Sequence, residues 1–289
     1  MKGIILAGGH GSRLYPATNI LSKQLLPVYD KPMIYYPLSI LMLSGITEIL
    51  IISTSEHINL YKKLFGNGDF LGLKIHYETQ ISPRGIADAF IVGEKFINNE
   101  PVCLILGDNI IYGQGISVSI KMAIESTIND NTANIFSFRV KDPENFGVLE
   151  YDNSGSLTNI VEKPIKTNSN YAVIGLYIYP NDIVSIAKKV KPSNRGEIEI
   201  ASINSYYLKH RRISVNQLGR GITWLDTGTP ESLHQASSFI NTIEKNNSFK
   251  IGCIEEIAFN LHLIDKDQLL KILNNMQDSN YKKYLQELL

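Results

Sequence analysis

Short apolar runs alternate along the first half of the chain with longer stretches in which apolar positions follow a helical spacing. The apolar runs lie at 2–7, 48–53, 73–77, 102–106 and 133–138. The helical stretches lie around 34–44, 57–65, 86–96 and 116–128. Apolar runs without polar alternation are typical of strands buried on both faces, as in parallel sheets. The alternation of strands and helices predicts a doubly wound α/β fold.

The pattern changes from about residue 145, where strands and turns dominate. We expect strands at 147–151, 157–162, 171–179 and 213–218, and helices around 181–189, 197–209 and 230–246. The segment Trp224–Gly228 is interpreted as a turn, and the last 40 residues as amphipathic helices. Together these patterns predict a mostly parallel, mixed sheet with three parts, at 1–140, 141–230 and 231–289.

Composition narrows the choice of partners and compartment. Lys plus Arg and Asp plus Glu are both 28, so the formal net charge is zero, which argues against a nucleic-acid partner. The chain holds 2 cysteines, too few for a disulfide framework, which favours a cytoplasmic protein. The most apolar stretch, 32–47, contains Pro37, Ser39, Ser44 and Gly45, so no membrane span is expected.

A glycine-rich loop follows the first predicted strand and contains Gly8, Gly9 and Gly11. It fits neither the dinucleotide fingerprint, which Leu14 breaks, nor the Walker loop. Two cations, Arg13 and Lys23, follow within a loop-like stretch, and such a pair suits a triphosphate. A second loop after a predicted strand carries Gly107-Asp108-Asn109. Ligands of open α/β sheets bind where such loops meet, so the two loops are expected to line one crevice.

The run GGHGSRLYPATNILSKQLLPVYDKPMIYYPLS, at 8–39, resembles the signature of sugar-1-phosphate nucleotidylyltransferases, and Lys23-Gln24 resembles their thymidylyl branch most closely. The resemblance extends through the motifs at 106–109, 146–148, 162–164, 195–197 and 224–228. It implies a Rossmann-like nucleotide-binding core at 1–140, sugar-phosphate-binding strands at 141–230 and a C-terminal segment for oligomerisation or regulation. It also implies Mg²⁺, a homotetramer, and transfer of a thymidylyl group from dTTP to glucose 1-phosphate with release of pyrophosphate.

The resemblance also assigns the charged residues of the reaction. Arg13 matches the position that grips the β- and γ-phosphates, and Lys23 matches a phosphate-binding lysine of the same loop. Lys163 matches the lysine that bridges the sugar phosphate and the α-phosphate. Asp108 and Asp226 match the metal ligands, and two carboxylates completed by phosphate oxygens and water suit Mg²⁺.

Further positions match the substrate-binding residues of the family. Gln80 and Gly85 match those reading the thymine edge, where one amide can satisfy the O4 acceptor and the N3 donor together. The other nucleotide-binding positions are Leu6, Gly8, Gly9, Gly11, Ser12, Gln24 and Asp108. The sugar-phosphate positions are Gly147, Glu162, Val173, Arg195 and Trp224, of which Val173 could equally be core packing and Trp224 a pocket wall.

The sequence departs from the family pattern at Asp88, where relatives of the thymidylyl type usually carry glutamine beside the base-reading loop. Three hypotheses therefore stay open: a thymidylyltransferase, a relative using UTP or another sugar phosphate, and a catalytically silent nucleotide-sugar-binding subunit. The silent subunit needs a broken site, whereas all five charged residues are present. Changes after Cys253 leave open whether a dTDP-sugar inhibits the protein at a second nucleotide site.

Overall fold

A computed structural model describes residues 1–9, 11–82 and 84–289, so His10 of the glycine loop and Pro83 lie outside the described residues. The strands are β1 (Lys2–Ala7), β2 (Pro27–Val28), β3 (Lys31–Pro32), β4 (Glu48–Ser53), β5 (Lys74–Thr79), β6 (Val102–Leu106), β7 (Asn109–Gly113), β8 (Ala133–Arg139), β9 (Gly147–Tyr151), β10 (Leu157–Glu162), β11 (Tyr171–Tyr179), β12 (Ile213–Gln217) and β13 (Ile222–Asp226). The α-helices are α1 (Tyr35–Leu43), α2 (Ile58–Phe65), α3 (Asp88–Val92), α4 (Glu94–Ile97), α5 (Ile116–Asp130), α6 (Ile183–Ala187), α7 (Ile200–Lys209), α8 (Pro230–Asn246), α9 (Ile254–Asn260), α10 (Lys266–Asn275) and α11 (Asn280–Gln286).

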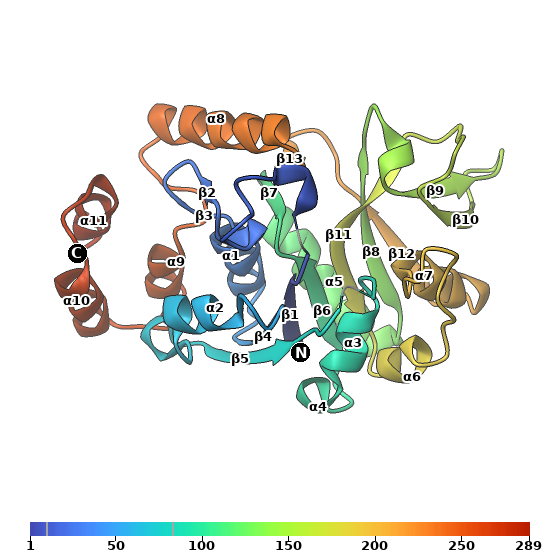
Figure 1. The fold of residues 1–289 in the computed structure, drawn as a ribbon, viewed down its shortest axis with the longest axis horizontal. Coiled ribbons are helices and arrows are strands. Elements are labelled where there is room, and N and C mark those ends of the chain that lie inside the picture. The colour runs from blue at the N-terminus through green and yellow to red at the C-terminus, as the bar shows by residue number, and fades with distance from the viewer. Residues whose placement is uncertain (10, 83) are drawn as a thin grey trace.

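One large mixed sheet organises the molecule (Figure 1). Within the described residues it has nine strands in the order β10-β9-β11-β6-β1-β4-β5, and β8 pairs with both β11 and β12. The central strands β6, β1, β4 and β5 are parallel to one another. Strand β11 is antiparallel to β6, β8 and β9, and it joins the parallel core to the later strands. The predicted α/β class and mixed sheet are confirmed.

Helices cover both faces of this sheet, because successive residues of the central strands point to opposite sides. Ile5 packs with residues of α1, α2 and α5 in one apolar cluster, whereas its neighbour Ile4 packs with residues of α3, α6 and α7 in another. Strand β6 divides in the same way, with Cys103 on the first side and Leu104 on the second. The continuous apolar runs thus belong to strands buried on both faces.

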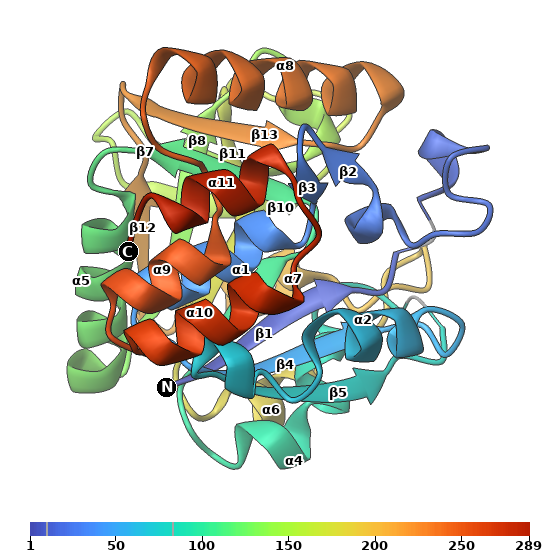
Figure 2. The same ribbon diagram turned by 90° about the vertical axis from the view of Figure 1, so that its left-hand side faces the viewer.

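The C-terminal helices α9, α10 and α11 lie together at the end of the molecule away from β9 and β10 (Figures 1 and 2). Helix α9 packs against α1, and α8 packs against β2 and β13. The sheet continues without interruption across residue 140, because β11 pairs with both β6 and β8. Over the ranges 1–9, 11–82 and 84–289, no helix is both long enough and apolar enough to cross a membrane.

Two predictions of local structure are wrong. The segment expected as a turn at 224–228 begins as the end of strand β13, which pairs antiparallel with β7. The interpretation failed because the partner strand lies more than 100 residues earlier, and local turn chemistry does not encode such a pairing. The helix expected over 86–96 is divided into α3 and α4 at Gly93, whose ψ of 7° lies outside the helical range.

Candidate active site

The loops that follow the parallel strands lie at one edge of the sheet, where strands β1, β4, β5 and β6 end. Leu6 of β1 pairs with Leu106 of β6, so the loops that begin at Gly8 and Gly107 leave the sheet side by side. The backbone N–H of Gln80, just after β5, donates to the carbonyl oxygen of Ser53 at 2.8 Å. This edge is where open α/β sheets bind their ligands.

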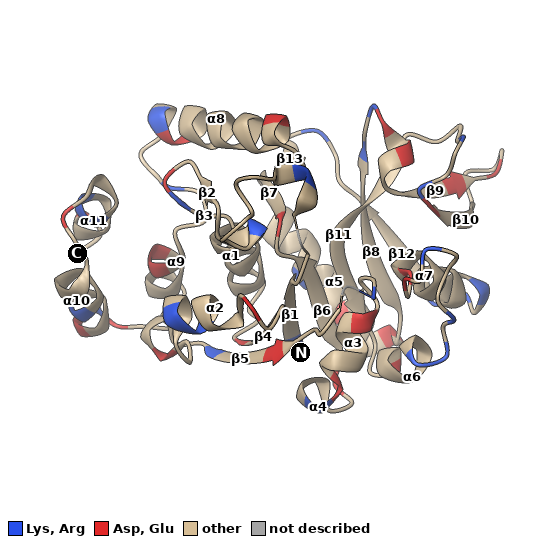
Figure 3. Ribbon diagram, viewed as in Figure 1, with Lys and Arg blue, Asp and Glu red and all other residues tan. Residues whose placement is uncertain are grey.

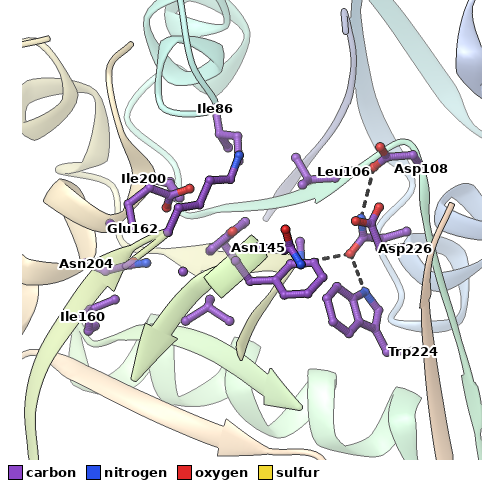
Figure 4. A pocket seen from close by; sticks show the side chains of 18 of the residues that line it. Ile86, Leu106, Asp108, Asn145, Ile160, Glu162, Ile200, Asn204, Trp224 and Asp226 are labelled. Atoms are coloured by element: carbon purple, nitrogen blue, oxygen red, sulfur yellow. Dashed lines mark hydrogen bonds between the residues drawn. The ribbon is translucent and has the colours of Figure 1, made fainter. Parts of the chain in front are cut away.

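The small β7–β13 ladder brings Asp226 to the same edge. Asp226 is the last residue of β13 and pairs with Asn109, the residue after Asp108. The hydroxyl of Thr227 donates to the backbone oxygen of Asp108 at 2.9 Å, which ties the two segments together. Figure 4 shows the carboxylates of Asp108 and Asp226 close to each other at one side of the pocket. Two acidic groups separated by more than 100 residues of chain thus lie in the same part of the pocket.

The charges around Asp226 define the electrostatics of this place. Burial raises the pKa of Asp226, and the negative charge of Asp108 raises it further. The cations of Lys23, Arg13 and Lys163 act in the opposite direction on the same carboxyl pKa. The positions of these groups agree with this: Arg13, Lys163 and both carboxylates line one cavity, and Lys23 contacts Asp108.

Lys23 and Arg13 are held by specific contacts. The Nζ of Lys23 lies 2.5 Å from Oδ2 of Asp108, and the lysine side chain is buried. Gly11 has φ of 60°, and a Cβ there would lie 3.1 Å from the Cβ of Lys23. A Cβ on Gly228 would lie 2.9 Å from Nη2 of Arg13. The glycines therefore leave the space in which these two cations approach the acidic pair.

Two adjacent cavities open at the same edge. The first, of about 190 Å³, is lined by residues that include Arg13, Asp108 and Asp226. The second, of about 250 Å³, is lined by residues that include Gly8, Gly9 and Gln80. Glu162 and Lys163 belong to the lining of both. The side-chain ammonium of Lys163 can therefore contact ligands in either cavity.

Lys163 has an unusual backbone conformation at this junction. Its φ is 43°, in the left-handed region that residues with a side chain seldom adopt. The conformation is held by the Lys163 N–H, which donates to the carbonyl oxygen of Phe146 at 3.0 Å. Strain of this kind persists only where surrounding structure imposes it, and it is concentrated at functional sites.

The far side of the first cavity is formed by strands β9, β10 and β11. Glu162 pairs with Gly147, where an added Cβ would lie 3.4 Å from Oε2 of Glu162. Val173 pairs with the same glycine from the other side. Burial raises the pKa of Glu162, and the neighbouring charge of Glu199 raises it further, whereas Lys163 and Arg195 lower it. A carboxylate in this position can accept hydrogen bonds from hydroxyl groups of a bound sugar.

Arg195 lines the second cavity and Trp224 lines the first. The guanidinium of Arg195 bonds both carboxylate oxygens of Glu199, at 2.9 and 3.0 Å, and lies 3.7 Å from Oε1 of Glu162. The Trp224 ring is buried and packs edge-on against Phe146, with ring centroids 5.0 Å apart. These contacts agree with the interpretation of Trp224 as a pocket wall.

Asn109 was missed in the sequence, although it directly follows Asp108. Its Oδ1 accepts hydrogen bonds from Nε1 of Trp224 at 2.7 Å and from the N–H of Gly175 at 3.0 Å. Its Nδ2 donates to Oδ1 of Asp108 at 3.1 Å. Asn109 therefore fixes the orientation of both Asp108 and Trp224. No sequence motif indicates this role. Asn204, which lines the first cavity, was missed as well.

The remaining predicted residues are distributed as follows. Leu6, Gly8, Gly9, Gln80, Gly85 and Arg195 line the second cavity. Gly147, Val173 and Trp224 line the first. Gly11, Ser12, Lys23 and Gln24 do not belong to either lining. The Gln24 side chain packs against Gly107 and accepts a hydrogen bond from Ser22.

Charged residues of both signs occur elsewhere in the described part of the chain, and some pair with one another, such as Lys31 with Glu244. Lys and Arg are interspersed with Asp and Glu over the ribbon (Figure 3). Apart from residues 10 and 83, which are not described, no group of three or more His, Cys, Asp or Glu is placed to hold a metal ion. Both cysteines are buried, and burial raises the pKa of the Cys103 thiol to about 12. This state suits packing rather than nucleophilic attack.

Gly85 supports the second cavity through its backbone, which gives a prediction for stability. Its φ is 102°, and an added Cβ would lie 2.5 Å from the carbonyl oxygen of Ile198. Gly85→Ala should therefore lower the free energy of unfolding by about 3 kcal/mol or more, because strain and a backbone clash add. Denaturant unfolding measures this change.

Gly155→Ala is the matched control, because Gly155 has φ of 81° but no neighbouring atom within 4 Å of the added Cβ. Only the conformational cost should appear there, about 1 kcal/mol. Equal losses in the two variants would contradict the packing of Gly85 against Ile198.

Comparisons with known proteins agree with this geometry. A family model described as nucleotidyl transferase matches residues 2–243. The chain is 50% identical over 289 residues to a glucose-1-phosphate thymidylyltransferase of Neisseria meningitidis, covering 100% of this chain and 99% of the relative. It is 46% identical to a protein of the same name from Mycobacterium tuberculosis, with 100% and 99% of the two chains covered.

Solved structures show the same fold. A Bacillus anthracis protein assigned as a glucose-1-phosphate thymidylyltransferase, in complex with sucrose, is 40% identical with a TM-score of 0.75, over 83% of this chain and 94% of that one. A UDP-glucose pyrophosphorylase with bound UDP-glucose is 27% identical with a TM-score of 0.72, over 85% and 99%. The resemblance seen in the motifs is confirmed, and the chain belongs to the nucleotidyl transferase family.

Proposed function

We propose that the chain transfers a thymidylyl group from dTTP to glucose 1-phosphate. A phosphate oxygen of glucose 1-phosphate attacks the α-phosphorus of dTTP, the bond from that phosphorus to the bridging oxygen of the β-phosphate breaks, and pyrophosphate leaves on the opposite side. The products are dTDP-glucose and pyrophosphate. Such a transfer needs positioning and charge neutralisation rather than a covalent intermediate on the protein.

The observation that carries this proposal is the meeting of three cations and two carboxylates at the first cavity. Arg13, Lys163, Asp108 and Asp226 line it, and Lys23 contacts Asp108. Lys163 and Glu162 line both cavities. A nucleotide in the second cavity and a sugar phosphate in the first would meet at Lys163, where two anions must be brought together.

Each cation has a distinct part in the proposed reaction. Arg13 offers a planar guanidinium suited to the β- and γ-phosphates and to the departing pyrophosphate. Lys163 donates to the oxygens of the attacking phosphate and of the α-phosphate. Lys23, which pairs with Asp108 in the structure, is expected to turn its ammonium toward the triphosphate when the nucleotide binds.

The acidic pair fits Mg²⁺. Two carboxylates close enough for one to raise the other's pKa favour a divalent cation between them, and Mg²⁺ commonly takes one or two protein carboxylates with the rest from phosphate and water. We therefore assign Asp108 and Asp226 as its ligands. When bound there, Mg²⁺ would neutralise negative charge on the phosphate oxygens. Asn109 keeps the Asp108 carboxylate oriented toward this position through its Nδ2.

Glu162 is proposed to accept hydrogen bonds from glucose hydroxyls, which gives a pH-dependent prediction. Because burial and Glu199 raise its pKa, the carboxyl takes up a proton at a higher pH than a free glutamate. The KM for glucose 1-phosphate should rise as the pH falls through this raised pKa, while Glu162→Gln should have a higher KM at pH 8 without this acid dependence. Steady-state kinetics from pH 5 to 8 measure both, and equal pH dependence in the two proteins would contradict the role.

The same shift has a definite sign for stability. A carboxyl whose pKa is higher in the folded than in the unfolded chain stabilises the fold below its unfolded pKa, and this contribution is lost as the pH rises through the folded value. Glu162→Gln should therefore unfold with an equal or higher free energy than the wild type at pH 8. The difference in the free energy of unfolding between Glu162→Gln and the wild type should become smaller as the pH falls.

The second candidate is a transfer from UTP, favoured by the similarity to a UDP-glucose pyrophosphorylase. Pyrophosphate release with glucose 1-phosphate, Mg²⁺ and each of dTTP, UTP, dCTP and ATP separates the two. We expect dTTP to be the fastest. Severalfold faster release with UTP would replace the first candidate by the second, and no release with any nucleotide would favour a silent binding subunit.

The homotetramer and the cytoplasmic location also stay predictions. Light scattering coupled to gel filtration measures the mass of the assembly, and a mass of four chains of 32.4 kDa each is the expected result. Fractionation of the source cell tests the location.

A further inference from the structure

Asp88 is a fully buried carboxylate that the proposed reaction does not use. It is the first residue of helix α3, and its exposed fraction is 0%. Its Oδ1 accepts a hydrogen bond from Nη2 of Arg84 at 2.7 Å, and its Oδ2 accepts one from Nε2 of Gln80 at 2.8 Å. A buried carboxylate needs hydrogen-bond donors, and here each of its oxygens has one.

An ionised carboxylate has only acceptors, which determines how the Gln80 amide is turned. The group of Gln80 that faces Asp88 must be the NH₂, because the amide oxygen there would meet a second acceptor. The Oε1 of Gln80 consequently faces the other way, toward Gly8, where an added Cβ would lie 2.9 Å from it. Gln80 and Gly8 both line the second cavity. In the second cavity the Gln80 amide therefore has one orientation, with its NH₂ toward Asp88.

We propose that Asp88 locks the Gln80 amide and thereby makes this cavity select an imide base over an aminopyrimidine. The proposal rests on the proposed function in one respect, the placement of the base at Gln80. One N–H of the amide is held by Asp88, while Oε1 and the other N–H remain for the base. This edge accepts from the N3–H and donates to a carbonyl oxygen of thymine or uracil.

A cytosine in the same pose is rejected by this orientation. Its N3 carries a lone pair that would face Oε1, and its amino group would face the N–H of the amide. A free amide could turn over and satisfy cytosine equally well, so discrimination depends on the lock and not on Gln80 alone. Asp88 is thus a positioning residue: it acts on the base through Gln80 and contacts no reacting atom.

Asp88→Asn is the sharpest variant, because it preserves shape and removes the charge. Arg84 has only donors, so the oxygen of the introduced asparagine should stay toward Arg84 and its NH₂ should face Gln80. The Gln80 amide must then turn over, which places its NH₂ toward the cavity. The ratio of the dissociation constants for dCTP and dTTP should fall about tenfold or more, since paired groups become mispaired.

Isothermal titration of dTTP and dCTP in Mg²⁺ measures this ratio without requiring turnover. Arg84→Gln is the matched control, because it perturbs the same network but leaves the Asp88 carboxylate facing Gln80, so the ratio should stay at the wild-type value. Asp88→Leu serves if the asparagine variant does not fold. It frees the amide without leaving a buried charge, and it should lower the ratio as well.

The results separate this proposal from the proposed function. A wild-type protein without preference for dTTP over dCTP, or a folded Asp88 variant with an unchanged ratio, overturns the lock. If the wild type binds dTTP preferentially and Asp88→Asn loses the preference, the lock stands even if no pyrophosphate is released from dTTP and glucose 1-phosphate. That last result would instead overturn the transfer activity.

Discussion

Replacing Lys163 by alanine should lower kcat by at least a few hundredfold while changing the KM values much less. Lys163 lines both cavities, so its ammonium can contact the attacking phosphate and the α-phosphate together. Negative charge on these oxygens must be stabilised most in the transition state. Removal of one such preorganised donor typically costs about 3 to 4 kcal/mol. Steady-state kinetics of pyrophosphate release measure both parameters.

The control for this variant is Lys166→Ala, which removes an exposed lysine three residues further along the same segment and should keep wild-type activity. The left-handed backbone of Lys163, with φ of 43°, does not favour alanine over lysine. The melting temperature of Lys163→Ala should therefore stay close to that of the wild type. Near-normal turnover of Lys163→Ala, or a rise in KM at unchanged kcat, would contradict a role in the transition state.

The second large effect is expected when either member of the acidic pair loses its charge. Asp108→Asn and Asp226→Asn should each lower kcat/KM by at least a few hundredfold, or about 3 to 4 kcal/mol. Each substitution keeps the shape of the side chain but removes a ligand that a hard divalent cation prefers. Both variants should also need a higher Mg²⁺ concentration for half-maximal rate, which a titration of Mg²⁺ at saturating substrates reveals.

Asp130→Asn is the matched control, since Asp130 is exposed at the end of α5, and it should behave as the wild type. Asp226→Asn also provides a check on the fold. Burial and Asp108 raise the pKa of Asp226, so the charged form is disfavoured in the metal-free protein. Its neutral variant should unfold no more easily than the wild type at neutral pH. A large loss of stability would mean that the lost activity reports folding instead.

Much of the fold could be predicted because its strands are buried on both faces. In β1, β4 and β6 at least four consecutive residues are apolar, since helices cover each side, and this leaves a pattern visible in one sequence. The β7–β13 ladder left no such trace. Its two strands have five residues each, and they meet only because the chain returns from β12 to the sheet edge.

The charged residues of the site were predictable for a different reason. Asp108 follows a buried strand and Arg13 follows a glycine loop, so topology alone brings them to one edge. The groups that orient them were not predictable. Asn109 carries three hydrogen bonds through a side chain whose partners, Trp224 and Gly175, come from β13 and β11. In the sequence Asp88 is only a departure from the family pattern, and its contact with Gln80 gives that departure a physical meaning.

The main conclusion is that both acids and all three cations surround the phosphates between which the transfer takes place. A crystal structure of the complex with dTDP-glucose and Mg²⁺ tests it most directly. We expect one ion about 2.0 to 2.1 Å from an oxygen of Asp108, an oxygen of Asp226 and an α-phosphate oxygen, with Lys163 bonded to the diphosphate. An ion held elsewhere, or a diphosphate outside the reach of Lys163, would contradict it.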